Sequence, residues 1–352
     1  MTPEHYRTAD FDYDLPTELI AQEPLPDRGG SRLLVVRRPN PSAPAGEDSL
    51  RDAWFADLPQ LVSGGDLVVI NTTRVRHARL LAARPSGRPA EVLLIHPGRD
   101  GTWIAMGQPG SALRPGKRVH LGDSAWVETV EILESGYRLV RFIGTTAEEA
   151  MHRYGKLPLP PYIHRDPTDL DELRYQTVYA EAEGSVAAPT AGLHFTPALL
   201  ESLRSKEVVV EGLDLQVGPG TFKPVEVDDP TQHDMHHERY HISPRLARRI
   251  TETRAAGGRI WAVGTTVVRA LESAAGSDGA IASGSRETRL MILPGYTFRV
   301  VDRLITNFHL PRSTLLMLVC AFAGRDLVLA AYHHAVAARY RFYSYGDSMV
   351  II

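Results

Sequence analysis

Three times in its second half, the sequence runs from a short apolar segment through a polar loop into a helix start. The first of these junctions spans residues 184–197 and ends in Thr196 and Pro197. Thr196 is a typical helix N-cap, and Pro197 suits the first helical position, where a missing N–H costs nothing. The second junction spans residues 259–272 and the third spans 303–314. This recurrence predicts that strands and helices alternate, and therefore predicts an α/β body.

Apolar runs and capping residues give approximate bounds for the elements of this body. The strands are predicted at residues 32–36, 66–70, 185–188, 208–217, 259–263, 290–293 and 303–307. The helices are predicted at residues 145–154, 197–205, 244–256, 267–274, 314–323 and 327–341.

Between residues 74 and 144 the pattern changes to short alternating runs that are separated by Gly, Pro and Asp turns. Regular short strands without a helical period are typical of a small β-barrel or sandwich. We therefore predict a mixed α/β body, formed by residues 1–73 and 145–352, that carries an inserted small β-barrel domain at residues 74–144.

Composition excludes several classes of protein. The chain has 352 residues, 43% of them hydrophobic, which is enough for a large core and two domains. Its single cysteine, Cys320, lies in an apolar run and cannot form an internal disulfide, as expected for a protein of the reducing cytoplasm. The N-terminus does not resemble a secretion signal and no apolar stretch approaches a membrane span, so we expect no membrane association. The formal net charge of -3 leaves RNA binding open, because basic residues can gather on one face.

Each junction offers groups suited to a binding site. Ligands usually bind at the carboxyl ends of strands in α/β proteins, where the first junction places a glycine, an imidazole and an aromatic ring. The helix start of the second junction has free N–H groups that attract a carboxylate or phosphate, although an ordinary capped helix is about as consistent with it. The third junction again has Phe beside His. The residues concerned are Thr190, Gly192, His194 and Phe195 in the first, Gly264, Thr265 and Thr266 in the second, and Asn307, Phe308 and His309 in the third.

Residues 233–241 form the densest polar cluster, with four histidines and Glu238. Three interpretations are open: a zinc site, histidines exposed on the surface, or hydrogen-bonding and acid–base groups of a site without metal. The cluster lacks the His-Glu-x-x-His spacing of metalloproteases, and we favour the third interpretation. The preceding turn, with Gly220 and Phe222, could approach a ligand closely.

Common cofactor motifs are absent from the sequence. It has no Gly-x-Gly-x-x-Gly dinucleotide loop, no Walker-type phosphate loop and no Gly-x-Ser-x-Gly nucleophile elbow. We therefore expect no bound cofactor and no metal.

Taken in order, the junctions and several further segments resemble the S-adenosylmethionine:tRNA ribosyltransferase-isomerase family of queuosine biosynthesis. The segments that carry the resemblance are residues 10–16, 157–163, 175–180, 184–196, 217–222, 233–240, 262–266, 304–311 and 342–347. The resemblance implies an α/β body with an inserted β-barrel. It also implies that the ribosyl part of S-adenosylmethionine, a substrate here, is transferred to the aminomethyl group of a 7-deazaguanine at the tRNA wobble position. The ribose is isomerised to an epoxycyclopentane, and adenine and methionine are released by what we expect to be a cytoplasmic monomer that binds the anticodon region.

This chemistry suggests roles for the candidate residues. A base must remove the proton next to the sulfonium, and the leaving adenine must be protonated or hydrogen-bonded. Aromatic faces would stabilise the sulfonium, and a helix start would hold the methionine carboxylate. We assign proton transfer to His194 and His309, the sulfonium to Phe195, Phe222 or Phe308, the carboxylate to Thr265, Thr266 and Arg269, and the amine or ribose hydroxyls to His236 and Glu238.

The chain departs from the family pattern at four positions. Thr72 stands where Asp is expected, Val267 replaces Ser, Pro219 replaces Ala, and Arg303 replaces Gly. These departures bear on the predicted identity of the acceptor more than on that of the donor. They leave open a diverged enzyme that transfers the ribosyl group to a small molecule, while a non-catalytic RNA-binding protein is disfavoured because the sequence shows no basic stripe interleaved with aromatic residues.

Overall fold

The computed structural model describes residues 6–39, 49–218 and 224–352. Its largest sheet has nine strands in the order β16-β14-β13-β3-β15-β17-β18-β1-β2. These strands are β1 (Arg32–Val36), β2 (Leu50–Trp54), β3 (Leu67–Asn71), β13 (Val209–Leu215), β14 (Glu238–Ile242), β15 (Ile260–Val263), β16 (Gly284–Thr288), β17 (Arg303–Asn307) and β18 (Ser348–Ile351). Strands β13, β3, β15 and β17 run parallel in the centre of the sheet, so their carboxyl ends lie at one edge.

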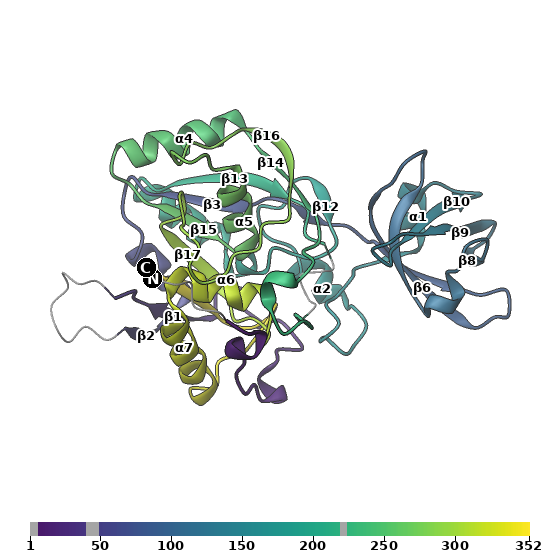
Figure 1. Cartoon of the computed structure of the whole chain (residues 1–352), viewed down its shortest axis with the longest axis horizontal. Helices are drawn as coiled ribbons and strands as arrows, with labels where there is room; N and C mark the ends of the chain where they lie inside the picture. Colours follow the sequence, from purple (N-terminus) through teal and green to yellow (C-terminus); the bar gives the residue numbers. More distant parts are fainter. Residues whose placement is uncertain (1–5, 40–48, 219–223) are drawn as a thin grey trace.

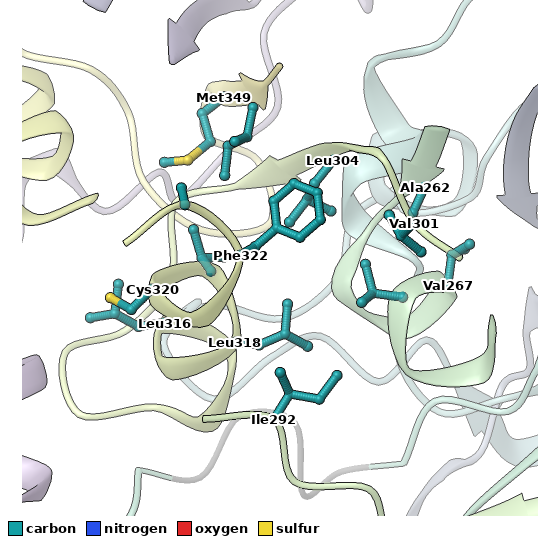
Figure 2. Close-up of a cluster of buried hydrophobic side chains, with 14 of the residues drawn as sticks. Ala262, Val267, Ile292, Val301, Leu304, Leu316, Leu318, Cys320, Phe322 and Met349 are labelled. Atoms are coloured by element: carbon teal, nitrogen blue, oxygen red, sulfur yellow. The ribbon is translucent and has the colours of Figure 1, made fainter. Parts of the chain in front are cut away.

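Helices cover both faces of this sheet, as they do in most parallel sheets. Successive side chains of β3 point to opposite faces, so Leu67 and Val69 join one core and Val68 and Ile70 join the other. The first core contains apolar residues of α4 (Pro244–Ala255), α5 (Thr265–Ala274), α6 (Thr314–Ala323) and α7 (Arg325–Ala337), and the second contains those of α3 (Pro197–Ser205) and the 3-10 helix η3 (Phe55–Gln60). Figure 2 shows part of the first core, to which α6 contributes Leu318 and Phe322 and β17 contributes Leu304.

A second, antiparallel sheet lies at one end of the molecule, apart from the nine-stranded sheet (Figure 1). Its strands are β11 (Gly155–Lys156), β5 (Arg79–Ala83), β6 (Pro89–Pro97), β7 (Trp103–Gln108), β10 (Arg138–Ile143), β9 (Ala125–Ile132) and β8 (Arg118–Gly122), in that order. Ala83 of β5 also pairs with His120 of β8. Helix α1 (Ala147–Tyr154) packs Ala147 and Ala150 into the core of this lobe. A separate two-stranded sheet pairs β4 (Arg74–Val75) with β12 (Glu183–Ser185).

The prediction of a mixed α/β protein is confirmed, and the boundaries of the inserted domain stay a prediction. Helices α3 and α6 have the predicted bounds because Thr196 and Ser313 cap them as the sequence indicates. The strand predicted at 290–293 is wrong, since this apolar segment packs on the core without strand pairing while the polar segment Gly284–Thr288 forms β16. Of the strand predicted at 185–188, only Ser185 lies in a strand.

No single helix in the described ranges is long and apolar enough to cross a membrane. Helices α6 and α7 would pass such a test only as a pair, and they are bent by 116° relative to each other.

Candidate active site at the carboxyl edge of the central strands

A cavity lies at the carboxyl ends of β15 and β17. It contains about 640 Å³ of space free of protein atoms, part of which is open solvent. All three junctions contribute to its wall, as expected for a site at the carboxyl edge of parallel strands. The predicted residues that line it are Thr190, Gly264, Thr265, Thr266, Asn307, Phe308 and His309.

The second junction presents the start of α5 to this cavity. Gly264 is the N-cap residue and has a φ of 93°, in the region that favours glycine. No side chain in the described part of the chain caps the first turn of α5. The N-terminal N–H groups of α5, beside the hydroxyls of Thr265 and Thr266, therefore give this part of the wall a preference for an anion.

The third junction places His309 in the cavity wall. Nε2 of His309 lies 2.7 Å from Oγ1 of Thr306, and the backbone N–H of His309 donates to the hydroxyl of Tyr332. Within the described ranges, Nδ1 of His309 has no hydrogen-bond partner. Burial lowers the pKa of His309 to about 3, so the ring is neutral near pH 7. Since a threonine hydroxyl can either donate or accept, both neutral tautomers of His309 can be held in this orientation.

His194 lies behind the wall of this cavity rather than in it. Its Nε2 accepts from Nδ2 of Asn307 at 3.1 Å, and its Nδ1 lies 2.8 Å from Oγ of Ser31. Its ring packs against that of Phe55, with centroids 5.0 Å apart. Burial lowers the pKa of His194 to about 4, which keeps this imidazole neutral as well. Asn307, which lines the cavity, therefore separates His194 from it.

Two tyrosines line the cavity that the sequence analysis did not assign. The rings of Tyr162 and Tyr343 are 4.6 Å apart, and the hydroxyl of Tyr162 contacts Oγ of Ser344. Tyr343 has a φ of 70°, which is unusual for a bulky residue and is typical of functional sites. Burial raises the pKa values of both tyrosines, so both are neutral phenols. Tyr162 and Tyr343 lie in segments 157–163 and 342–347, which carry the family resemblance. The sequence analysis assigned no role to any residue of these two segments.

Besides His194, two more predicted residues of the first junction lie outside the lining of this cavity. The ring of Phe195 is fully buried and packs edge-on against Phe55 at 5.2 Å and Tyr179 at 6.1 Å. Gly192 lies under Tyr179, since a Cβ at this position would come within 2.1 Å of the tyrosine hydroxyl oxygen. The glycine thus makes room for a side chain of the protein.

Glu238 and Arg269 form a buried ion pair that does not line the cavity. Nη1 of Arg269 lies 2.9 Å from Oε2 of Glu238, and the two side chains are only 7% and 5% exposed, respectively. Among the described residues, Nε and Nη2 of Arg269 have no hydrogen-bond partner. His236 is half-buried at the lobe, where its Nδ1 lies 3.2 Å from the hydroxyl of Tyr137. None of these three residues is in the described lining of the cavity that contains His309.

The remaining predicted residues are placed as follows. Gly220 and Phe222 lie outside the described residues, as does the departure at Pro219. Thr72 follows the end of β3 and donates to the carbonyl of Leu213 at 3.2 Å, while Val267 is fully buried in the first core. Arg303 is the first residue of β17, at the end of that strand away from the cavity.

In the described ranges, no group of three or more His, Cys, Asp or Glu side chains is arranged to hold a metal ion. The histidines of residues 233–241 instead have separate partners: His237 lies 3.5 Å from Glu287, and His241 lies 2.9 Å from the hydroxyl of Ser285.

Comparison with known proteins gives a consistent result. Residues 8–351 match the family model described as queuosine biosynthesis protein. The S-adenosylmethionine:tRNA ribosyltransferase-isomerase of Azoarcus sp. (strain BH72) is 51% identical over 342 residues, which cover 97% of this chain and 96% of that protein. The protein of the same name from Symbiobacterium thermophilum is 50% identical over 349 residues, 98% of this chain and all of its own. The crystal structure of S-adenosylmethionine tRNA ribosyltransferase from Thermotoga maritima matches with a TM-score of 0.54 and 34% identity, and covers 97% of this chain and 100% of its own.

Proposed function

Because this chain belongs to the queuosine biosynthesis protein family, we propose that it is an S-adenosylmethionine:tRNA ribosyltransferase-isomerase, the activity named for its relatives. The acceptor is the aminomethyl group of 7-aminomethyl-7-deazaguanine at the wobble position of a tRNA. The ribosyl group of S-adenosylmethionine is transferred and isomerised, adenine and methionine are released, and the product is epoxyqueuosine-tRNA.

The observation that carries this proposal is the composition of the cavity wall, which offers partners for the carboxylate and for the sulfonium of the donor. The start of α5, at Thr265 and Thr266, suits the methionine carboxylate. The rings of Tyr162 and Tyr343 suit the sulfonium, since a cation over an aromatic face gains about 0.5–2 kcal/mol. The sulfur carries the positive charge that acidifies the neighbouring proton of the ribose. These contacts would therefore hold the reacting carbon beside the wall that contains His309.

We assign proton transfer to His309. It is neutral near pH 7, so it can accept the proton that the sulfonium acidifies, and in the same site it can return a proton to the departing adenine. The Thr306 hydroxyl keeps the ring oriented in either tautomer. His194, which the sequence analysis also assigned to proton transfer, instead supports Asn307 from behind the wall. The ligand contacts predicted for Phe195, Phe222, Phe308, His236, Glu238 and Arg269 stay predictions.

The seven-stranded sheet is the inserted barrel of this proposal, with β8 and β5 closing it at Ala83 and His120. It stands apart from the nine-stranded sheet (Figure 1) and is suited to contact the RNA beyond the modified base. We propose that the protein works as a cytoplasmic monomer, with neither metal nor cofactor besides its two substrates.

Chromatography of nucleobases tests the proposal. Incubated with S-adenosylmethionine, the protein is expected to release adenine only when a tRNA carrying 7-aminomethyl-7-deazaguanine is present. Adenine release without any RNA would favour a small-molecule acceptor and overturn the tRNA assignment. RNA binding with no release under any condition would overturn the enzymatic assignment. An otherwise identical tRNA with guanine at the wobble position serves as the control and is expected to give no adenine.

A further inference from the structure

A second, smaller cavity lies on the far side of His194 from the candidate active site. It has about 300 Å³ free of protein atoms, and Arg28, Arg174 and His194 are among the residues that line it. Ser344 lines both cavities. Leu173, next to Arg174 in the chain, is 72% exposed, which places this region at the protein surface. The second cavity is therefore a surface pocket that adjoins the donor site.

Two arginines of this pocket's lining, Arg28 and Arg174, and a third whose charge acts on His194, lack a carboxylate partner among the described residues. Within the described ranges, neither Arg28, Arg174 nor Arg341 takes part in an ion pair. Their guanidinium groups donate to backbone carbonyls instead: Arg28 to Gln176 at 2.9 Å and Arg174 to Pro26 at 3.1 Å. No carboxylate of the described residues thus lies within ion-pair distance of these guanidinium groups, although the charge of Asp27 acts on Arg174 and those of Asp347 and Glu23 act on Arg341.

The charges of these arginines act on one another and on His194. The charge of Arg174 contributes to lowering the pKa of Arg28, although burial is the larger cause. Arg28, Arg174 and Arg341 also contribute to the lowered pKa of His194, again after burial. Like charges within range of each other raise the free energy of the empty pocket, which a bound anion would lower.

One buried guanidinium group lies close to the pocket without belonging to its described lining. Nη1 of Arg341 has no hydrogen-bond partner among the described residues, and the charge of Arg341 acts on His194. Asp27 is the acidic residue of the described pocket lining, and its Oδ1 accepts the N–H of Gly29 at 3.1 Å. The lining thus carries two guanidinium groups against one carboxylate, a net positive charge that suits an oxyanion.

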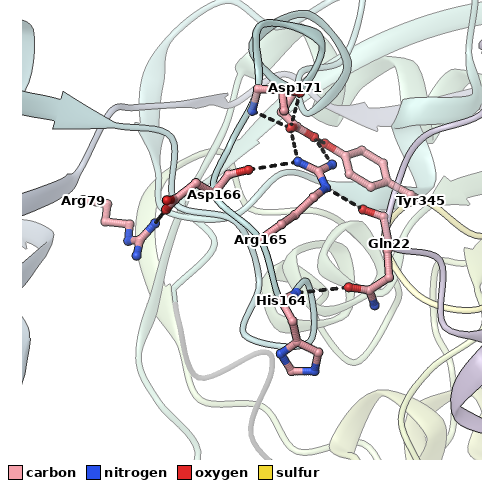
Figure 3. Close-up of polar contacts among 8 residues, drawn as sticks. Gln22, Arg79, His164, Arg165, Asp166, Asp171 and Tyr345 are labelled. Carbon is pink, nitrogen blue, oxygen red and sulfur yellow. Dashed lines mark hydrogen bonds and ion pairs between the residues drawn. The ribbon is translucent and has the colours of Figure 1, made fainter.

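Helix α2 (Asp169–Arg174) is held in place by a buried carboxylate at its start, shown in Figure 3. Asp171 is completely buried and accepts hydrogen bonds from Arg165, from the N–H of Thr168 and, at 2.7 Å, from the hydroxyl of Tyr345. The Arg165 guanidinium and the other hydrogen bonds keep the pKa of Asp171 well below its usual range, despite burial. Tyr345 lines the pocket, so this network fixes both the pocket wall and the helix that ends in Arg174.

We propose that Arg28 and Arg174, with the charge of Arg341 close to them, bind a backbone phosphate of the RNA acceptor, and so hold the RNA next to the donor site. This inference rests on the proposed function. A phosphodiester fits better than a free carboxylate, because its tetrahedral oxygens can accept from several guanidinium groups at once at the surface.

Binding of an anticodon stem-loop that carries 7-aminomethyl-7-deazaguanine, measured without donor over a range of salt concentrations, tests the proposal. Arg174→Gln and Arg28→Gln are each expected to weaken binding about tenfold and to reduce the slope of log K against log salt by roughly one. The KM for S-adenosylmethionine is expected to stay the same. Arg204→Gln on α3, which removes an arginine that is 57% exposed, is the matched control and should bind like the wild type.

Unchanged RNA affinity and salt slope in both folded variants would overturn the proposal. A raised KM for S-adenosylmethionine with unchanged RNA affinity would also overturn it, since the anion would then belong to the donor. If either variant fails to fold, hydrogen exchange of the wild type gives the answer: the stem-loop should protect residues 23–30 and 169–176, and no protection there would contradict the proposal. Failure of the proposed function is distinct, because it shows in the wild type as adenine release without RNA or as no release at all, and neither result depends on the two arginine variants.

Discussion

Nδ2 of Asn307 lies 3.1 Å from Nε2 of His194, and the same amide donates to the carbonyl of Tyr343 at 3.0 Å. One side chain thus connects the buried histidine of the first junction to the strained tyrosine of the cavity wall. The two histidines that the sequence presents as equivalent, His194 and His309, consequently occupy different environments. One supports the wall from behind, and the other forms part of it.

This difference predicts distinct effects of removing each imidazole. His309→Gln should lower kcat for adenine release at least 100-fold, because a positioned acid–base group contributes about 10²–10⁴-fold. His194→Gln should lower the free energy of unfolding by about 1–3 kcal/mol, because buried groups of Asn307 and Ser31 lose a partner. Its loss of kcat should be the smaller one. Steady-state kinetics and urea unfolding measure both quantities, and the reverse order of kcat losses would contradict the assignment of His309.

The same two histidines predict how stability depends on pH. Their pKa values in the folded protein, about 4 for His194 and about 3 for His309, lie below the value of about 6.5 in an unfolded chain. Between these pKa values the unfolded chain therefore binds more protons than the folded protein. The contribution of the two neutral histidines to the free energy of unfolding is thus complete above pH 6.5 and is lost as the pH falls. Each of the two histidines should lower the free energy of unfolding by about 2 kcal/mol between pH 7 and pH 5.

Urea unfolding at pH 5, 6 and 7 checks this dependence. The double variant His194→Gln/His309→Gln should show a much shallower decline than the wild type, whereas substitution of the exposed His152 by Gln should leave the decline unchanged. Parallel curves for the wild type and the double variant would show that these histidines are not the cause.

Tyr162 offers a test of the sulfonium contact. Tyr162→Leu should raise the KM for S-adenosylmethionine about tenfold, since it removes an aromatic face whose cation–π contact contributes about 0.5–2 kcal/mol. Tyr162→Phe keeps the ring and removes only the contact of its hydroxyl with Ser344, so its KM should change less than threefold. Equal KM values for the two variants would show that the ring of Tyr162 does not contribute to donor binding.

Because Glu238 and Arg269 form a buried ion pair, we expect the stability of the fold to depend strongly on keeping both charges or removing both. Glu238→Gln should lower the free energy of unfolding by about 3–5 kcal/mol, because it leaves the guanidinium buried without a counter-charge. The double variant Glu238→Leu/Arg269→Met should recover most of this loss, since apolar residues of similar volume replace a buried pair at little cost. Chemical denaturation checks both, and a double variant no more stable than Glu238→Gln would argue against this account.

Local signals in the sequence predicted part of the fold well and another part poorly. The starts of α3 and α6 depend on Thr196 and Ser313, whose hydroxyls accept from N–H groups three residues later. In contrast, β16 has no apolar alternation and exists because it pairs with β14, while β18 is a short strand held between β1 and β17. Strands whose pairing partners are remote in the chain are set by tertiary contacts, which propensity does not reveal.

The site was predictable to a similar extent. Residues that follow strands, such as Gly264 and His309, reach the cavity because parallel strands end at one edge of the sheet. Tyr162 and Tyr343 reach it from segments whose positions depend on packing, and the φ of 70° at Tyr343 has no signature in the sequence. For the same reason, nothing in the first junction showed that His194 would lie behind Asn307.

The position of β18 has a consequence for how the chain reaches its native state. β18 joins β1 and β2 to the rest of the nine-stranded sheet, yet it follows every other strand of that sheet in the sequence. On the ribosome, which makes the N-terminal end first, one edge of β1 and one edge of β17 therefore stay unpaired until residues 348–351 have emerged. Unpaired strand edges can associate with other polypeptides, so this sheet is open to aggregation until β18 is in place.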